Sequence, residues 1–322
     1  MKKRSLVTSV GVLTVALLWP GAVATAAAAN LFANVTASGG LIGGSGVTGV
    51  AQLGPGQYEV SFDADVSQCA YVATTANWYS QALQVFTAGG HLGPNGVYVE
   101  TKNQGGGLTD GPFHLVVVCD APHMNYAVVG YSSNLVRATP GATLRDLGWG
   151  RYTITFPEPI SSCAYVATVG DPGRELVYYP SGVYTASGRD SQTVYIETKN
   201  PGGGLQSGVP FHLAVICPSA PNTRIAVVND SGLPERGSPL TSSFNWPWAA
   251  GEYVVVTDRS ITPNCATVAT RGSVNHAVPY SPATVELSWS PASNAIGFQV
   301  RDLLFFGGGF TNQAFHAAIV CE

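Results

Sequence analysis

Apolar and polar residues alternate in short runs along this chain. Residues 57–62 (QYEVSF) and 151–156 (RYTITF) carry an apolar side chain at every second position, and turn-forming Gly, Pro, Ser or Asn residues separate such runs. Successive side chains of a β-strand point to opposite faces of the sheet, so this period predicts strands joined by turns. The sustained spacing of an amphipathic helix does not occur after the N-terminal segment. The pattern predicts an all-β protein.

One hairpin sequence occurs twice almost unchanged and a third time in divergent form. The first two copies read VYVETKNQGGGLTDGPFHLVVVC and VYIETKNPGGGLQSGVPFHLAVIC, and the third reads FQVRDLLFFGGGFTNQAFHAAIVC. In the third copy Arg301 stands at the position of the acidic residue of ETKN. Each copy predicts a strand that enters a Gly-rich loop and returns as a Cys-bearing strand. In the first copy, Phe113, Leu115, Val117 and Cys119 share one face of that strand.

The segments around the hairpin also repeat, which divides the chain into three units. SQCAYVATT, SSCAYVATV and PNCATVATR surround the first cysteine of the three copies. Seven or eight strands per copy suit a two-sheet β-sandwich of about 100 residues, either of immunoglobulin-like size or jelly-roll-like. We predict three tandem antiparallel β-sandwich domains after a leader: leader 1–29, repeat 1 at 30–121, repeat 2 at 122–220 and a degenerate repeat 3 at 221–322. Whether they pack around an axis or form a rod stays open, as do strand order and oligomeric state.

All six cysteines lie after the leader, two in each repeat. In an exported chain such cysteines pair, and the repeat favours one pair per copy among the 15 connectivities that six cysteines allow. The spacing lacks the clustered ligands of a zinc site. We predict one disulfide within each domain: Cys69–Cys119, Cys163–Cys217 and Cys265–Cys321.

The N-terminal residues have the pattern of a secretory signal peptide. Lys2, Lys3 and Arg4 precede an apolar stretch at residues 5–19, and small residues suited to cleavage follow. An uncleaved membrane anchor is the alternative, although the apolar stretch is short for a span. We predict cleavage and a secreted, extracellular protein without a membrane span in its mature form.

Charge excludes two classes of partner. The chain has 19 acidic residues and 15 basic ones, and three of the basic ones lie in the leader. Only Lys102 and Lys199 remain as lysines after it. A nucleic-acid or anionic-lipid partner requires a basic surface, so neither is expected.

The signature Gly-x-Tyr-x-Val-x-Phe of residues 56–62, followed by Cys-Ala-Tyr-Val-Ala-Thr and Phe-His-Leu-x-Val-x-Cys, resembles a module of uncharacterised secreted tandem-repeat β-sandwich proteins of high-GC Gram-positive bacteria. The resemblance covers nearly the whole chain after the leader and is strongest in repeats 1 and 2. It implies a secreted bacterial β-repeat protein and carries over no catalytic residue. The strand pattern is also similar to the jelly-roll heads of bacteriophage tail and C1q-like proteins.

Two repeated sets of residues are candidates for chemistry. His114, His212 and His316 occupy one position, as a repeated ligand or general base, or as structural histidines paired across the hairpin with Glu100 or Glu197. The pairs Glu100 with Lys102 and Glu197 with Lys199 predict solvated charge pairs on a strand face. Motifs for a hydrolase, a metalloprotease or a phosphate loop do not occur. We predict no catalytic residue, no metal site and no cofactor, and hence no enzyme.

Aromatic residues in variable loops are the candidate binding residues. Trp78 and Tyr79 in repeat 1, and Tyr178 and Tyr179 in repeat 2, could stack on sugars or anchor a protein interface. Trp149 precedes a Tyr-bearing strand, as Trp248 does in repeat 3, and is expected to lie in the core.

These observations predict a secreted, non-catalytic binding or adhesion protein that recognises a glycan or a protein surface through loop aromatics. The alternatives are a structural component of the cell envelope or spore coat, and a secreted inhibitor or toxin accessory. Binding predicts exposed aromatics at one end of the molecule. A structural array predicts apolar faces, such as Val116 and Val118, that join the copies. An enzyme predicts one cleft with converging polar groups in a single copy.

Overall fold

A computed structural model describes most of the chain after the leader. The described residues are 30–76, 82–174, 181–238, 240–245, 249–261, 264–275, 282–288, 292–303 and 309–322. Within them the secondary structure consists of strands and turns, which confirms the all-β prediction. The described residues include no helix long and apolar enough to cross a membrane.

In the described part of the chain each repeat contributes eight strands. Repeat 1 contains β1 (Leu31–Val35), β2 (Leu41–Ser45), β3 (Val47–Gly54), β4 (Gln57–Phe62), β5 (Ala70–Thr75), β6 (Leu83–Gly89), β7 (Gly96–Asn103) and β8 (Phe113–Val118). Repeat 2 contains β9 (Met124–Val129), β10 (Leu135–Ala138), β11 (Thr143–Gly148), β12 (Arg151–Thr155), β13 (Ala164–Val169), β14 (Gly182–Ser187), β15 (Thr193–Lys199) and β16 (Phe211–Ile216). Repeat 3 contains β17 (Thr223–Val228), β18 (Pro234–Ser238), β19 (Leu240–Asn245), β20 (Glu252–Thr257), β21 (Cys265–Ser273), β22 (Ala283–Leu287), β23 (Ala295–Asp302) and β24 (Phe315–Cys321).

Within a repeat the strands form an inner and an outer sheet. The inner sheets have the orders β2-β1-β8-β5, β10-β9-β16-β13 and β18-β17-β24-β21, and the outer sheets have the orders β3-β4-β7-β6, β11-β12-β15-β14 and β19-β20-β23-β22. A short parallel pairing of β14 with β21 joins the outer sheet of repeat 2 to the inner sheet of repeat 3. Repeats 2 and 3 therefore share one eight-stranded sheet and are not fully separate domains.

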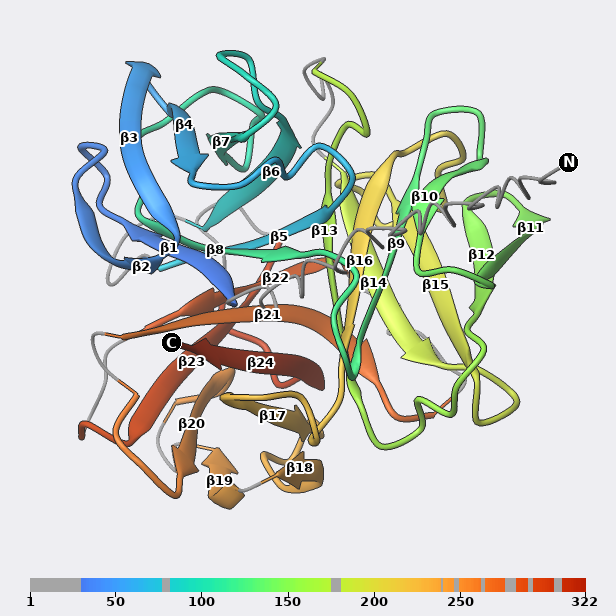
Figure 1. Ribbon diagram of the computed structural model, residues 1–322. Coiled ribbons are helices and arrows are strands. Elements are labelled where there is room, and N and C mark those ends of the chain that lie inside the picture. Colours follow the sequence, from blue (N-terminus) through green and yellow to red (C-terminus); the bar gives the residue numbers. More distant parts are fainter. Residues whose placement is uncertain are drawn as a thin grey trace, which may run out of the picture.

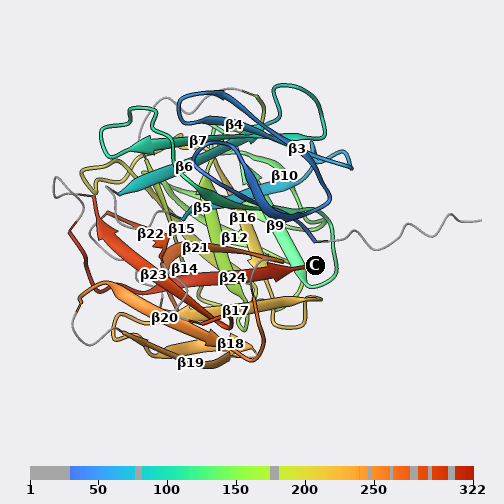
Figure 2. The same ribbon diagram turned by 90° about the vertical axis from the view of Figure 1, so that its left-hand side faces the viewer.

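The three repeats surround a common centre. Figure 1 shows repeat 1 at the upper left, repeat 2 at the right and repeat 3 at the lower left, with the inner-sheet strands β5, β8, β21 and β24 near the middle. The view turned by 90° shows repeat 1 above repeat 3 (Figure 2). The arrangement is a ring around an axis and not a rod.

Apolar side chains fill the space inside each repeat and also the space between repeats. Phe113, Leu115 and Val117 belong to the core between the two sheets of repeat 1, which confirms that they share one face. Val116 and Val118 belong to a central cluster to which all three repeats contribute. Because both faces of β5, β8 and their equivalents in the other repeats are buried, most side chains of these strands are apolar.

Threonine side chains close the ring by capping strand edges. β5, β13 and β21 lie at the edges of their inner sheets, and such edges present unpaired backbone groups. The hydroxyl of Thr168 accepts a hydrogen bond from the Ala73 N–H (2.9 Å) and donates to the Ala73 carbonyl (3.1 Å). The same two bonds join Thr270 to Ala167 and Thr74 to Ala269. The contacts run from repeat 1 to 2, from 2 to 3 and from 3 back to 1.

The disulfides form within each repeat, as the spacing of the cysteines predicts. The bonds are Cys69–Cys119, Cys163–Cys217 and Cys265–Cys321, with sequence separations of 50, 54 and 56 residues. Each joins the start of an edge strand (β5, β13 or β21) to the end of the neighbouring strand, which is the last one along the chain in that repeat (β8, β16 or β24). Closing a loop of this length stabilises a fold by about 4 kcal/mol in the loop-entropy account. Three such bonds are typical of chains that fold in an oxidising compartment.

The capping threonines give a test of the ring. Thr168→Val keeps the side-chain shape but leaves the buried N–H of Ala73 without an acceptor, so we expect a loss of about 1–3 kcal/mol in the free energy of unfolding. Thr143→Val, at an exposed strand position, should change it by less than about 0.5 kcal/mol. Urea unfolding followed by fluorescence measures both. Equal stability of the two variants would contradict the capping role.

Candidate functional site

The repeated histidines lie at the joints between repeats. Their Nδ1 atoms accept hydrogen bonds of 2.9 to 3.0 Å from backbone N–H groups of an adjacent repeat: His212 from Tyr71, His316 from Tyr165 and His114 from Thr267. These contacts run around the ring in the same sense as those of the threonines. The geometry supports the structural interpretation, but the partners are backbone groups of another repeat and not Glu100 or Glu197.

Burial keeps the imidazoles of His212 and His316 neutral, and desolvation acts in the same direction on the partly buried His114. Desolvation lowers the pKa of His114 to about 4 and the pKa of His212 and of His316 to about 3. The Nε2–H of His212 donates to the Asp171 carbonyl at 3.0 Å, which leaves Nδ1 as the acceptor. A proton on Nδ1 would break a cap and place a charge in the core.

The charge pairs predicted as solvated are buried, so that prediction is wrong. Lys102 Nζ lies 2.8 Å from Glu100 Oε2, and the two side chains are 7% and 4% exposed. Lys199 and Glu197 form the same pair at 3.1 Å. In repeat 3 the strand register places Gln299 opposite Glu252, as Glu100 lies opposite Gln57. Arg301 therefore takes the lysine position and not the acidic one.

The outer sheets are covered near the centre because neighbouring repeats meet there. Glu286, on β22, accepts a hydrogen bond from the Leu83 N–H of repeat 1 at 2.6 Å and lies 3.3 Å from Arg301 Nε. Desolvation raises the pKa of this carboxyl to about 8, against the opposing effects of Leu83 and Arg301. The alternating charges in the sequence do not reveal that this face of the sheet is buried, because the residues that cover it belong to another repeat.

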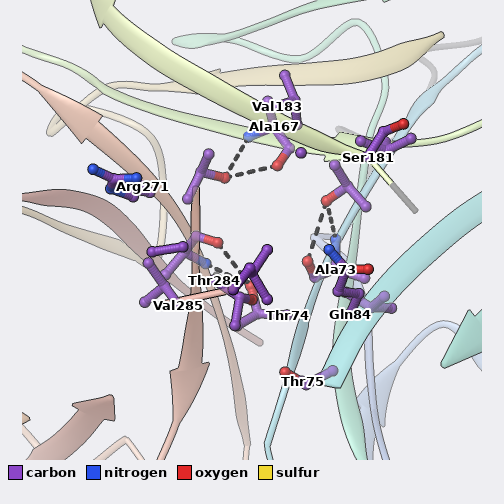
Figure 3. Close-up of a pocket in the computed structure, with 18 residues that line it drawn as sticks. Ala73, Thr74, Thr75, Gln84, Ala167, Ser181, Val183, Arg271, Thr284 and Val285 are labelled. Carbon is purple, nitrogen blue, oxygen red and sulfur yellow. Dashed lines mark hydrogen bonds between the residues drawn. The ribbon is translucent and has the colours of Figure 1, made fainter. Parts of the chain in front are cut away.

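A small polar chamber of about 70 Å³ lies on the axis (Figure 3). Its walls include one Ala-Thr pair from each repeat, and the dashed lines of Figure 3 mark the hydrogen bonds of the capping threonines. The next position along the three edge strands differs between the repeats: Thr75 in repeat 1, Val169 in repeat 2 and Arg271 in repeat 3. The volume is enough for a few water molecules.

Some of the buried polar atoms without partners belong to residues that line this chamber. In the described part of the chain, Thr75 Oγ1, Gln84 Oε1 and Arg271 Nε and Nη1 are buried and make no hydrogen bond. The Arg271 side chain is 3% exposed and its guanidinium lies 5.4 Å from the Tyr184 ring centre. Desolvation lowers its pKa to about 10, although Tyr184 and Asp302 oppose this. Burial of these unpaired polar groups at the centre of the fold is energetically unfavourable.

The four predicted binding aromatics lie outside the described residues. Trp78 and Tyr79 fall within 77–81, and Tyr178 and Tyr179 fall within 175–180. The described residues that flank these segments, Thr75 and Gln84 on the one hand and Ser181 on the other, line the axial chamber. Loop binding by these aromatics stays a prediction.

Trp149 is not a core residue, so that expectation is wrong. Its side chain is 75% exposed and its backbone is left-handed, with φ of 56° between Gly148 at 83° and Gly150 at 74°. It forms the tip of the β11–β12 hairpin, beyond the end of the sheet. The sequence does contain a signal for this turn, because Gly148-Trp149-Gly150 repeats the Gly-Pro-Gly of residues 54–56. Trp248 lies outside the described residues.

A groove of about 710 Å³ crosses the outer sheet of repeat 2, within the size range of ligand sites. The strands β11, β12, β14 and β15 and the loop after β14 form it. Its lining is rich in hydroxyls and charged groups and consists of Thr143, Arg145, Leu147, Thr153, Thr155, Ser187, Gly188, Arg189, Asp190, Thr193 and Tyr195. Trp149 follows Leu147 by two residues on the same hairpin.

This lining is particular to repeat 2. By strand register, Arg145, Thr153 and Thr155 correspond to Ala51, Glu59 and Ser61 in repeat 1 and to Phe244, Val254 and Val256 in repeat 3. The fold does not require a polar groove at this position, because two repeats build the same sheet without these residues.

The groups in the groove are hydrogen-bond donors and acceptors. The Tyr195 hydroxyl donates to Glu197 Oε1 at 2.9 Å, and burial raises the pKa of Tyr195 to about 12. Asp190 accepts from the Gln192 N–H at 3.0 Å, and hydrogen bonds to Thr193 and Gln192 lower its pKa. Among the described residues, no three His, Cys, Asp or Glu side chains are grouped to hold a metal ion.

The chain matches no protein-family model, no curated protein and no solved structure. Its function is therefore argued from its own geometry.

The buried histidines predict a pH dependence of stability. Their folded pKa values lie below the unfolded value of about 6.5, so unfolding takes up protons. The free energy of unfolding therefore falls as the pH falls from about 6.5 towards the folded pKa values of about 4 and about 3. His212→Asn keeps an acceptor for Tyr71 without a titrating ring. We expect its slope against pH to be smaller by about 1.4 kcal/mol per pH unit. His123→Asn, at an exposed residue outside the joints, should keep the wild-type slope, measured by urea unfolding at several pH values.

Arg271 predicts a gain in stability on substitution. Arg271→Met removes a buried cation whose Nε and Nη1 make no hydrogen bond within the described residues, so we expect the free energy of unfolding to rise by about 1–2 kcal/mol. Arg137→Met is the matched control, because Arg137 donates to the carbonyls of Cys69 (2.9 Å) and Pro172 (2.6 Å) and its loss should destabilise. A loss of stability in both variants would show that Arg271 serves the fold.

Proposed function

We propose that this protein is a secreted, non-catalytic glycan-binding protein that holds its ligand on the outer sheet of repeat 2. The observation that carries this proposal is the groove over β11, β12, β14 and β15. Sugar hydroxyls both donate and accept hydrogen bonds, and the threonine, serine, arginine and aspartate side chains of the groove supply both kinds of partner. Tyr195 adds an aromatic surface on which a sugar face can stack.

The exposed Trp149 supports recognition on the same hairpin. A left-handed backbone costs a residue with a side chain roughly 1–2 kcal/mol, and exposing an indole to water is unfavourable as well. Arg145 and Leu147 on β11 line the groove, and Trp149 lies in the turn that follows this strand. Strain and exposure of this kind are typical of sites retained for function.

Several features support the remaining parts of the proposal. The three disulfides and the leader sequence support secretion. The first and last strands of each repeat are neighbours in its inner sheet, which favours three jelly-roll-like domains over immunoglobulin-like ones, whose first and last strands lie in different sheets.

Glycoside hydrolysis uses a pair of carboxylates, and Asp190 is the one carboxylate among the described residues of the lining. A single cleft in one repeat is also a feature of enzymes, but its groups favour binding.

A structural role in the cell envelope or spore coat is the second candidate. Val116 and Val118 do join the repeats, in the central cluster, as a structural array predicts. The faces they form are closed in a ring within one chain. A structural protein of this design would assemble through its outer surface.

Polysaccharide sedimentation tests the proposed function. The mature protein, with its disulfides formed, is incubated with peptidoglycan, cellulose and chitin and then centrifuged. The double variant Arg145→Ala with Trp149→Ala should weaken binding about tenfold or more, as loss of a contact worth over about 1 kcal/mol does. Leu53→Ala, which changes an exposed side chain beside the equivalent turn of repeat 1, is the control and should bind as wild type.

A second variant separates the groove from the predicted loop aromatics. It changes Trp78, Tyr79, Tyr178 and Tyr179 to Ala. Loss of sedimentation in this variant alone would place the site on those loops and contradict the groove. If the wild type sediments with none of the polymers, glycan binding is wrong, and self-association in analytical ultracentrifugation would then favour the structural role.

A further inference from the structure

The joint between repeats 3 and 1 differs from the other two joints of the ring. In the other two, a tyrosine stacks on the capping histidine of the next repeat: Tyr71 on His212 at 4.9 Å and Tyr165 on His316 at 5.0 Å between ring centres. Their hydroxyls donate to the carbonyls of Val66 and Ile160 within their own repeats. An aromatic ring thus fills the space beside each of these two histidines.

An arginine completes each of the two filled joints. Arg137 donates to the Cys69 carbonyl and lies over the Tyr71 ring, at 5.6 Å from its centre. Arg236 donates to the Cys163 carbonyl at 3.2 Å and to the Tyr165 hydroxyl at 3.1 Å. The guanidinium of Arg236 therefore bridges a cysteine carbonyl and the phenol.

The third joint keeps the histidine but lacks both of these side chains. Strand register places Thr267 where the other repeats have Tyr71 and Tyr165. It places Gly43 where they have Arg137 and Arg236. The amide of Asn34 replaces one arginine contact, because its Nδ2 donates to the Cys265 carbonyl at 2.8 Å.

A cavity of about 210 Å³ occupies the space that these side chains leave. It exceeds the engineered apolar cavity of about 150 Å³ that accepts benzene. One wall is apolar and comes mainly from repeat 3, with Ile261, Leu287 and Ile296, and the other carries Asn34 and His114 of repeat 1. Ile42, 60% exposed, lies at its rim and marks a route of entry.

Asn34 presents an unused acceptor in this cavity. The side chain is 4% exposed, and within the described part of the chain its Oδ1 is buried without a hydrogen-bond partner. A buried acceptor left unpaired is unfavourable, so a ligand that donates a hydrogen bond to it gains affinity. Asn34 Nδ2 and Arg236 Nη1 donate to equivalent cysteine carbonyls, so the Asn34 amide stands in for the arginine that contacts the tyrosine hydroxyl in the joint of Tyr165.

We propose that this cavity binds one small phenol-like molecule, a planar aromatic ring that carries a hydroxyl donor. The ring stacks on the imidazole of His114 as Tyr71 and Tyr165 stack on their histidines, and it packs against Ile261, Leu287 and Ile296. Its hydroxyl donates to Asn34 Oδ1. The two filled joints show that this space accepts a phenol, since a tyrosine side chain occupies the corresponding space in each of them.

The test uses p-cresol, the side-chain analogue of tyrosine, and toluene, which has the same shape without the donor. Calorimetry and ligand-observed NMR with the disulfide-bonded protein should show saturable binding of one p-cresol per chain, with a dissociation constant of roughly 1 mM or below. Toluene should bind at least about tenfold more weakly. Absence of p-cresol binding up to its solubility, or more than one site per chain, overturns the proposal.

Two variants place the ligand. Thr267→Tyr restores the residue of the other repeats, so it should raise the thermal midpoint and weaken p-cresol binding at least tenfold. Thr48→Tyr, at an exposed position of β3 outside the cavity and the groove, should leave binding unchanged. Asn34→Val introduces the residue that repeats 2 and 3 carry at that position, and it should abolish the preference for p-cresol over toluene. This variant tests the site even if Thr267→Tyr does not fold. Unchanged binding by Thr267→Tyr, or an unchanged preference in Asn34→Val, contradicts the site.

Discussion

The fold depends on how the free edges of three strands are capped. β5 and β13 each end an inner sheet, β21 ends its own apart from a short pairing with β14, and the outward backbone groups of all three strands face an adjacent repeat. A threonine and a histidine from an adjacent repeat satisfy those groups, and the contacts return from repeat 3 to repeat 1. A single repeat would leave its edge unpaired. Three repeats in one chain close the ring without a partner chain.

The ring explains the composition of the inner strands. Their outward faces meet in one central cluster, so residues that would be polar on an isolated sandwich are Ala, Val and Ile. The close packing of neighbouring repeats also accounts for the buried charge pairs and for Glu286, which accepts a hydrogen bond from another repeat. Disulfides then hold each edge strand to the last strand of its own inner sheet. Packing between repeats is thus as much a part of the core as packing within them.

Differences among the repeats mark the positions that the ring does not constrain. The capping His and Thr are identical in all three repeats, because each joint needs the same hydrogen bonds. Arg271, the groove lining of repeat 2 and the Thr267 joint depart from the pattern without a structural demand. Each departure leaves something that a uniform repeat would lack: a buried cation, a polar groove and a cavity with an unused acceptor. The groove and the cavity are the two places where we propose that a ligand binds.

Local pattern and repeat determined the all-β class, the three disulfides and the common face of Phe113, Leu115 and Val117, because strand period and cysteine spacing depend on neighbours in the chain. The exposure of Trp149 was missed although its Gly-Trp-Gly turn is local, because an apolar residue before a strand was taken as core. The burial of Glu100 and Lys102, the neutral histidines, the groove and the cavity beside Thr267 were decided by the tertiary structure. Whether a strand face is exposed to water or buried depends on contacts with residues of another repeat. The local pattern of apolar and polar residues does not contain these contacts, because they form only when the three repeats pack into the ring.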